Sequence, residues 1–174
     1  MAKLRKFVAY RRLERPYTRV SKFREKSYVR SRPHLKVARF ETGDAKTNFK
    51  FKVHLVAMSD VQVRDNALES GRQAGGRALE DGAGKNMYHL ILRVYPHHIL
   101  RENPLAAGAG ADRMSTGMSH SFGKSIGVAA RVFKGQQVFT AEVHKEGVEA
   151  AKEAMRKAGS KLPCRCTVTI EEIK

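Results

Sequence analysis

The chain has 174 residues, of which 41% are hydrophobic, and its 34 Lys and Arg residues against 17 acidic ones give a net charge of +17. This length suits one globular domain with an extension. No apolar stretch approaches the roughly 18 residues of a membrane span, and the first residues lack the apolar core of a secretory signal, so we expect a cytoplasmic protein with no membrane partner.

The basic residues are concentrated at the N-terminal end. The first forty residues contain fourteen Lys or Arg against two acids, a net of twelve, whereas residues 41–174 contain twenty against fifteen, a net of five. Six aromatic residues are interleaved with these cations. That pattern favours RNA, because cations bind phosphates while rings stack on exposed bases. The alternative, a disordered basic tail, would not be expected to hold six large aromatics. The candidate RNA-binding residues are Arg5, Lys6, Arg11, Arg12, Arg15, Arg19, Lys22, Arg24, Lys26, Arg30, Arg32 and Lys36.

After this basic segment the sequence has the patterns of a strand, a helix and a second strand. Phe49 to Ala57 alternates apolar and polar side chains, as a half-buried strand does. Ser59 and Gln62 match a capping box, which predicts that a helix starts there and extends to about Asp81. Met87 to Tyr95 then predicts a strand with one apolar face.

The C-terminal half repeats this order of elements. Gly127 to Phe133 and Gln136 to Val143 predict a β-hairpin, in which Gly135 can adopt the positive φ of a tight turn. Residues 145–158 predict a helix, since its apolar residues recur at helical spacing and its acids precede its bases. Cys164 to Ile170 predicts the last strand.

These elements predict an α+β fold, a two-layer arrangement with both helices on one face of a mixed β-sheet. We divide the chain into a basic aromatic extension, residues 1–34, and an α+β domain, residues 35–174. Cys164 and Cys166 lack the spacing of a metal site, and a disulfide between them would be strained, so we expect both to pack in the core. We expect no metal, no cofactor and no small-molecule substrate.

A long loop, residues 101–126, has neither helical nor strand periodicity. Loops longer than about 12–15 residues are usually functional or disordered. Its many glycines and alanines would let another backbone approach closely, and Arg101, Arg113 and Lys124 are spaced through it as phosphate ligands. The loop is therefore suited to a crowded anionic environment.

Motifs of enzymes are incomplete in this region. The glycines at 108 and 110 lack the third glycine of a dinucleotide fingerprint, since Arg113 stands at its position. Near Gly84-Lys85 a P-loop also fails, because Asn86 replaces the required Ser or Thr and position 79 is Leu. His97, His98 and Asp112 could form an acid–base pair for RNA cleavage, but nothing else completes such a site. We therefore expect no enzymatic activity.

The loop and its flanks resemble one family closely. The motifs are His98-Ile-Leu-Arg101-Glu-Asn103, Ala109-Gly110-Ala111-Asp112-Arg113, Thr116-Gly117-Met118, Phe122-Gly123-Lys124 and Ala130-Arg131-Val132, together with Pro16-Tyr17-Thr18-Arg19 near the start. They are similar to those of the universal large-subunit ribosomal protein sixteen family, in its archaeal and eukaryotic "ten-e" form and most of all its archaeal members. The resemblance covers nearly the whole chain.

This resemblance implies a hammerhead-type α+β fold and a structural role in the large ribosomal subunit during translation. The implied partners are large-subunit rRNA, 5S rRNA, aminoacyl-site tRNA and neighbouring large-subunit ribosomal proteins. The loop would lie near the peptidyl transferase centre and the tRNA. A free RNA-binding protein or RNA chaperone is the alternative, since it shares the basic aromatic segment. The implied loop residues are Arg101, Asn103, Ala109, Gly110, Ala111, Asp112, Arg113, Thr116, Gly117, Met118, Phe122, Gly123 and Lys124.

Overall fold

The computed structural model describes residues 4–18, 22–23, 25, 29, 32–103 and 123–173. These residues form two helices, two short 3-10 turns and eight strands. The elements are η1 (Phe7–Ala9), β1 (Glu41–Gly43), β2 (Phe51–Ala57), β3 (Val61–Arg64), α1 (Asp65–Ala83), β4 (Tyr88–Leu92), β5 (His98–Glu102), β6 (Lys124–Val132), β7 (Gln137–Val143), η4 (Lys145–Gly147), α3 (Val148–Gly159) and β8 (Cys166–Glu172).

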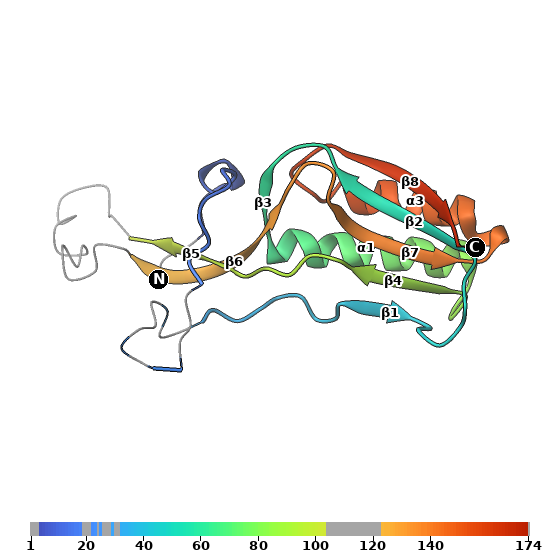
Figure 1. The fold of residues 1–174 in the computed structure, drawn as a ribbon, viewed down its shortest axis with the longest axis horizontal. Coiled ribbons are helices and arrows are strands. Elements are labelled where there is room, and N and C mark those ends of the chain that lie inside the picture. Colours follow the sequence, from blue (N-terminus) through green and yellow to red (C-terminus); the bar gives the residue numbers. More distant parts are fainter. Residues whose placement is uncertain are drawn as a thin grey trace.

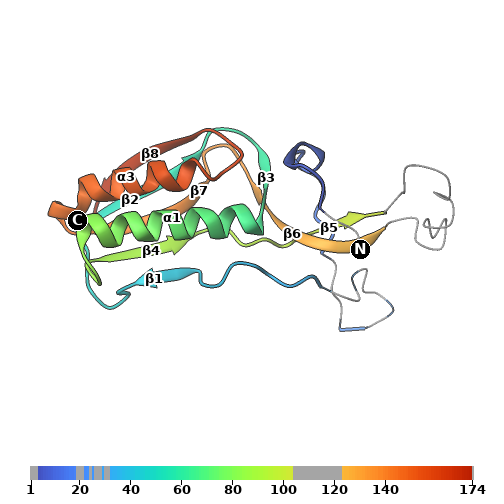
Figure 2. The same cartoon turned by 180° about the vertical axis from the view of Figure 1, so that it is seen from behind.

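The strands form two separate sheets. A five-stranded sheet has the order β1-β4-β7-β2-β8, and a three-stranded sheet has the order β3-β6-β5. Both helices lie side by side on one face of the five-stranded sheet, as Figure 1 and the reverse view in Figure 2 show. The predicted α+β class, with two helices on one face, is confirmed. Neither described helix has an apolar run that could cross a membrane.

The single mixed sheet that we predicted is wrong, because every pairing among the described strands is antiparallel. In each strand–helix–strand unit, a third strand separates the two strands that would otherwise pair in parallel. β7 lies between β2 and β4, and β2 lies between β7 and β8. Antiparallel neighbours result, although each unit crosses over through a helix as predicted.

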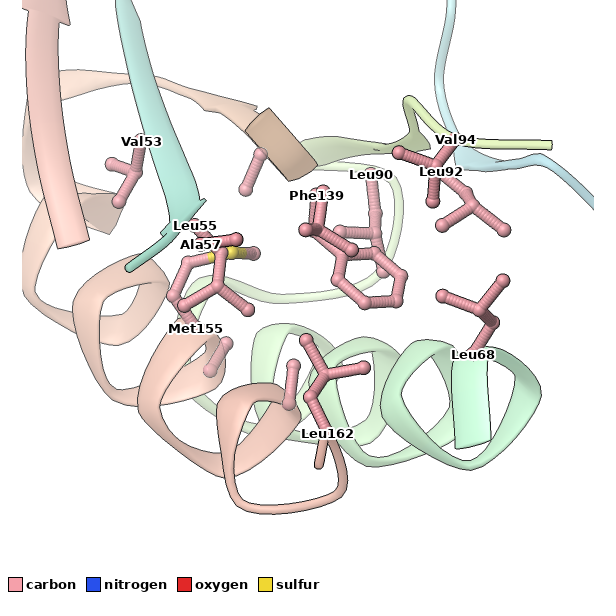
Figure 3. Packing of buried hydrophobic residues seen from close by; sticks show 14 of the residues in the cluster. Val53, Leu55, Ala57, Leu68, Leu90, Leu92, Val94, Phe139, Met155 and Leu162 are labelled. Atoms are coloured by element: carbon pink, nitrogen blue, oxygen red, sulfur yellow. The ribbon is translucent and has the colours of Figure 1, made fainter. Parts of the chain in front are cut away.

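The core lies between the five-stranded sheet and the two helices (Figure 3). Alternate side chains of β2, β4 and β7 face the helices, and Phe139 of β7 is fully buried. Gly71 and Gly75 of α1 allow close packing: a Cβ at Gly71 would lie 3.2 Å from the Phe139 ring, and one at Gly75 would lie 3.4 Å from Ala158 Cβ of α3. The small residues therefore let α1 approach both the sheet and α3, which offsets their low helix propensity.

The capping box predicted at Ser59 and Gln62 is wrong. Val61–Arg64 forms strand β3, and helix α1 begins at Asp65, with no side-chain cap from Arg64. The Asp65 carboxylate instead accepts a hydrogen bond from the Asn66 amide at 2.9 Å, and its other oxygen accepts one from the Lys36 amide at 3.1 Å. Asp65 thereby places its negative charge in the first turn, where the helix dipole favours it.

The predicted β-hairpin is also corrected. The turn at residues 133–136 exists, with Gly135 at a φ of 82° and the Gln136 amide donating to Phe133 O at 3.0 Å. However, β6 pairs with β3 and β5, whereas β7 pairs with β2 and β4. The turn bonds to Ala57 at the end of β2, which directs the chain from one sheet to the other.

Two glycines of α1 give a matched test of this packing. Gly76→Ala should stabilise the fold by up to about 1 kcal/mol, because alanine favours helix and the added Cβ meets nothing within 4 Å. Gly82→Ala brings the same gain in propensity, but its Cβ would lie 2.6 Å from Ala150 Cβ. Urea denaturation should therefore rank Gly76→Ala above wild type and Gly82→Ala below Gly76→Ala. Equal stability of the two variants would contradict the packing described.

Candidate RNA interface

The N-terminal segment packs on one face of the three-stranded sheet. Tyr10 is buried with Leu100 of β5 and Ala129 of β6, and Leu4 packs against this cluster. Gly127 of β6 gives Leu4 its space, since a Cβ there would lie 3.3 Å from Leu4 Cδ1. Val63, Ala130 and Val132 of this sheet belong to the main core together with helix α1, but the cluster around Leu100 contains no helix residue. The N-terminal segment therefore supplies the apolar contacts there.

The opposite face of the same sheet is covered by later residues of that segment. Val29 is buried with Ile99 of β5 and Val128 of β6, and Tyr17 and Leu35 pack around them. Ile99 and Leu100 are adjacent in the strand, so their side chains point to opposite faces. The segment before residue 36 therefore contacts both faces of the small sheet.

A polar cluster attaches the start of the segment to β5. The Tyr10 hydroxyl donates to Glu102 Oε1 at 2.5 Å and accepts from the Arg5 amide at 3.2 Å. The Arg5 guanidinium pairs with Glu102 Oε2 at 3.0 Å, and the Glu102 side chain is only 11% exposed. Burial, and then the hydrogen bond to Glu102, raises the pKa of Tyr10 above its ordinary value. Tyr10 therefore remains a protonated donor at neutral pH.

Strand β3 provides the second attachment. The buried Gln62 side chain donates to the carbonyls of Tyr10 and Arg12, and its backbone amide donates to Arg11 O at 3.3 Å. Arg64 donates to Arg5 O at 2.9 Å, and its guanidinium lies 5.9 Å from the centre of the Tyr10 ring. Gln62 thus satisfies backbone groups that a buried strand-like segment would otherwise leave unpaired.

His98 has a structural role in this arrangement. Its Nδ1 accepts the Tyr17 amide at 2.9 Å, and burial lowers its pKa, with Arg101 and Arg131 acting in the same direction. It is therefore neutral at neutral pH. His97 lies on the exposed side and its ring contacts Tyr95, so the adjacent histidines do not form one site. Asp112, the third residue of the nuclease hypothesis, lies outside the described residues.

The predicted RNA-binding cations that the structure describes are all exposed. They belong to the N-terminal segment itself and lie on its exposed side. Among them only Arg5 forms an ion pair with a described carboxylate. Two rings of the same segment are turned toward the protein: Tyr10 is buried, and the Arg101 guanidinium of β5 lies 3.9 Å from the centre of the Tyr17 ring. Phe23, in contrast, is 55% exposed. The described cations are Arg5, Lys6, Arg11, Arg12, Arg15, Lys22, Arg32 and Lys36, whereas Arg19, Arg24, Lys26 and Arg30 lie outside the described residues.

The two ends of the long loop lie together on the small sheet. Glu102 of β5 pairs with Lys124 of β6, and Arg101 pairs with Ser125. Gly123 has a φ of 73°, and a Cβ there would lie 2.7 Å from the Glu102 carbonyl carbon, so this position requires glycine. Arg101, Asn103, Gly123 and Lys124 are thus at the base of the loop. The other predicted loop residues, from Ala109 to Phe122, lie outside the described residues.

The two cysteines are free and half-buried against the core, as the sequence predicted. Cys164 precedes β8 rather than lying within it, and the two Sγ atoms are 3.7 Å apart. A hydrogen bond from the Cys166 thiol lowers the pKa of Cys164 to about 7. No group of three or more metal-binding side chains occurs in the part of the chain that the structure describes.

The sequence predicted a helix-capping role for Gln62, whereas the structure places it in β3, where its side chain binds the N-terminal segment. Gln62→Ala should leave the Tyr10 and Arg12 carbonyls without a partner, which weakens attachment of the segment by about 1–2 kcal/mol. Tryptic cleavage after Arg11 and Arg12 should become faster, while the five-stranded sheet keeps its unfolding transition. Gln73→Ala is the matched control, because the exposed Gln73 amide only donates to Glu69 at 3.0 Å. Unchanged cleavage in Gln62→Ala would contradict this role.

Comparison with known proteins agrees with the resemblance found in the motifs. The family model for ribosomal protein L16p/L10e matches residues 14–169. A protein of Methanococcus aeolicus is 45% identical over 168 residues, covering 96% of this chain and 94% of that protein. A relative from Methanococcus maripaludis is 46% identical, and the alignment covers 98% of this chain and 96% of that protein. A relative from Archaeoglobus fulgidus is 43% identical, and the alignment covers 94% of this chain and 90% of that protein. All three relatives are named large ribosomal subunit protein uL16.

The family match therefore includes both helices, strands β1 to β7, the first part of β8 and the basic segment from Glu14 onward. It also begins at Glu14 and ends at Thr169, so it contains both ends of the long loop. On this match and on the archaeal relatives, the chain belongs to the ribosomal protein L16p/L10e family, in its archaeal type.

Proposed function

We propose that this chain is a structural constituent of the large ribosomal subunit, held in the cytoplasmic ribosome by contacts between its N-terminal segment and large-subunit rRNA. The supporting observation is the division of that segment: Leu4, Tyr10, Tyr17 and Val29 pack on the small sheet, and its described cations are exposed. A rigid array of cations binds phosphates without first losing backbone entropy. As a member of this family, the chain is a ribosomal protein and not an enzyme.

The charge distribution supports one end of the molecule as the RNA-binding end. The predicted RNA-binding cations in the described part of the chain come from the segment before residue 37, whereas residues 41–174 carry a net of only five positive charges. Local excess of one charge sign raises the local concentration of the opposite sign and speeds association. The small sheet with its attached segment is therefore the better surface for a polyanion than the helices.

The finer partners are further proposals. In this proposal 5S rRNA and aminoacyl-site tRNA are neighbours of the chain, and the loop at residues 101–126 extends from the small sheet toward the tRNA near the peptidyl transferase centre. The base of the loop supports this, because its paired ends fix where it leaves the sheet. Neighbouring large-subunit proteins would contact the remaining surface.

A free RNA-binding protein or RNA chaperone is the second candidate. It would use the same exposed cations but would have no need of a long Gly- and Ala-rich loop. Sedimentation distinguishes the two: a subunit constituent should remain with large subunits through a moderate salt wash, whereas a free binder should return to the light fractions.

The cations give a quantitative prediction. Each neutralised phosphate contributes about 0.9 to the log–log salt slope on duplex and about 0.7 on single strands. Changing Arg11, Arg12 and Arg15 together to Gln should therefore make the slope for binding purified large-subunit rRNA shallower by about 2–3. The matched control changes three exposed cations elsewhere, Lys85, Arg156 and Lys161, to Gln. An equal effect of both triple variants would mean that only total charge matters.

The loop gives a separate prediction. Shortening it between Asn103 and Gly123 removes few of the chain's cations, so the variant should still enter large subunits. Peptide synthesis should nevertheless become slower, because the RNA and the tRNA end would be less constrained. Arg113→Ala tests the same idea with one side chain, by measuring aminoacyl-tRNA binding to subunits that contain the variant. Normal synthesis rates in fully occupied mutant subunits would contradict a functional loop, and failure to enter subunits would make it an assembly contact.

A further inference from the structure

Three aromatic rings form a row where the chain runs between the two sheets. The rings of Phe40 and Tyr95 are stacked, with 5.3 Å between their centres and 17° between their planes. The Tyr95 and His97 rings follow, 4.5 Å apart and tilted by 45°. Offset stacked and tilted contacts are the favoured arrangements of aromatic pairs. Phe40, Tyr95 and His97, called the ring row below, are thus ordered against one another.

The ring row is on the outside of the molecule. Tyr95 is 45% exposed and His97 is also exposed, whereas Leu92, Val94 and Pro96, which alternate with the exposed residues, are buried. The segment from Leu92 to His97 therefore fills the core with one side and presents Tyr95 and His97 on the other, while the half-buried Phe40 packs between Tyr95 and the core. Hydrogen bonding holds the two contributing segments together, since the Leu92 amide donates to Phe40 O at 2.8 Å.

Cations accompany the ring row. Arg39 precedes Phe40 and Arg93 lies two residues before Tyr95; both are exposed, and neither forms an ion pair with a carboxylate in the described part of the chain. Arg93 is held in place, because its Nε donates to Thr140 Oγ1 at 3.1 Å. The nearest acid in the sequence, Glu41, lies 3.7 Å from Nε2 of His89. The two arginines, each within two residues of a ring of the row, are thus exposed and available for phosphates.

Rings and cations at one place suit a nucleotide better than an apolar partner. The face of any base stacks on an aromatic ring, and a nearby cation neutralises the phosphate of the same nucleotide. A protein or lipid partner would favour an apolar surface, but here the tyrosine hydroxyl, imidazole and two guanidinium groups interrupt it. Single exposed aromatics are common and need no partner. Two successive ring contacts, with two exposed arginines close in the sequence, are a more specific arrangement.

We propose that the ring row is a stacking site for one unpaired base of large-subunit rRNA, with Arg39 and Arg93 binding the phosphates on either side of that base. This inference rests on the proposed function, and it adds a contact outside both the N-terminal segment and the long loop. The site takes a base through its face, so it selects an unpaired nucleotide rather than a particular sequence.

Ultraviolet crosslinking of intact large subunits that contain the wild-type chain tests the inference directly. Mass spectrometry should find a nucleotide attached to Tyr95 or His97. Subunits that contain Tyr95→Ser with His97→Ser should then show increased reactivity of one or two rRNA nucleotides toward reagents that acylate the 2′-hydroxyl of flexible nucleotides. Binding of the free double variant to purified large-subunit rRNA should be about tenfold weaker, as expected for the loss of one stacked base.

Phe133→Ser is the matched control, because Phe133 is 46% exposed and Arg131 lies 5.4 Å from its ring centre, but it is not part of the ring row. It should leave the rRNA reactivity unchanged, and Tyr95→Phe should behave as wild type. Two results would overturn this inference but leave the proposed function intact. One is a crosslink from the ring row to another ribosomal protein. The other is no crosslink together with unchanged 2′-hydroxyl reactivity of the rRNA. Absence of the wild-type chain from large subunits would overturn the proposed function and this inference with it. The crosslink uses no variant, so a failure of the variants to fold does not affect it.

Discussion

The apolar residues of β5 and of the adjoining part of β6 lie in two clusters that contain no helix residue, and the rest of this end of the molecule depends on how those clusters are covered. The N-terminal segment covers both, with Leu4 and Tyr10 on one face of the sheet and Val29 and Tyr17 on the other. Each ring or aliphatic group that points inward leaves the neighbouring cations pointing outward. Packing and the proposed RNA binding are therefore properties of the same segment but of alternating residues, so loss of the packing would also displace the cations.

This arrangement has an electrostatic cost that a polyanion would remove. Twelve net positive charges in the first forty residues repel one another, and concentrated charge of one sign opposes compact structure. Only a few described contacts, such as Glu102 with Arg5, offset this repulsion locally. Any ligand that binds the attached form better than the detached form stabilises it. RNA is thus expected to complete the folding of this segment as well as to be bound by it.

Local patterns in the sequence predicted many of the helices and strands, but they did not predict which strands pair with one another. The alternation at β2 and the helical spacing in α1 depend on which side of each element is buried, and this is encoded within a few residues. The insertion of β7 between β2 and β4 depends on contacts between residues more than eighty positions apart, such as His54 with Thr140. Gln62 shows the same limit, because the Ser-x-x-Gln pattern of a capping box also fits a strand residue whose side chain bonds to the carbonyls of Tyr10 and Arg12, far earlier in the chain. Nor could sequence separate the buried ring of Tyr10 from the exposed ring of Tyr95.

Glu102 connects the RNA-binding segment to the loop. In the strand register, Glu102 of β5 lies opposite Lys124 of β6 at the base of the loop. Its carboxylate binds both the Tyr10 hydroxyl and the Arg5 guanidinium of the N-terminal segment. Gly123 fits beside its carbonyl, where no side chain could be accommodated. Displacement of the N-terminal segment would therefore leave a carboxylate that is now 11% exposed without its partners, at the point where the loop leaves the sheet. Because both features share two short strands rather than a linker, RNA that fixes the segment would also fix the origin and direction of the loop. In the proposed function, this shared support would let phosphate contacts of the segment position a loop that itself carries few of the cations.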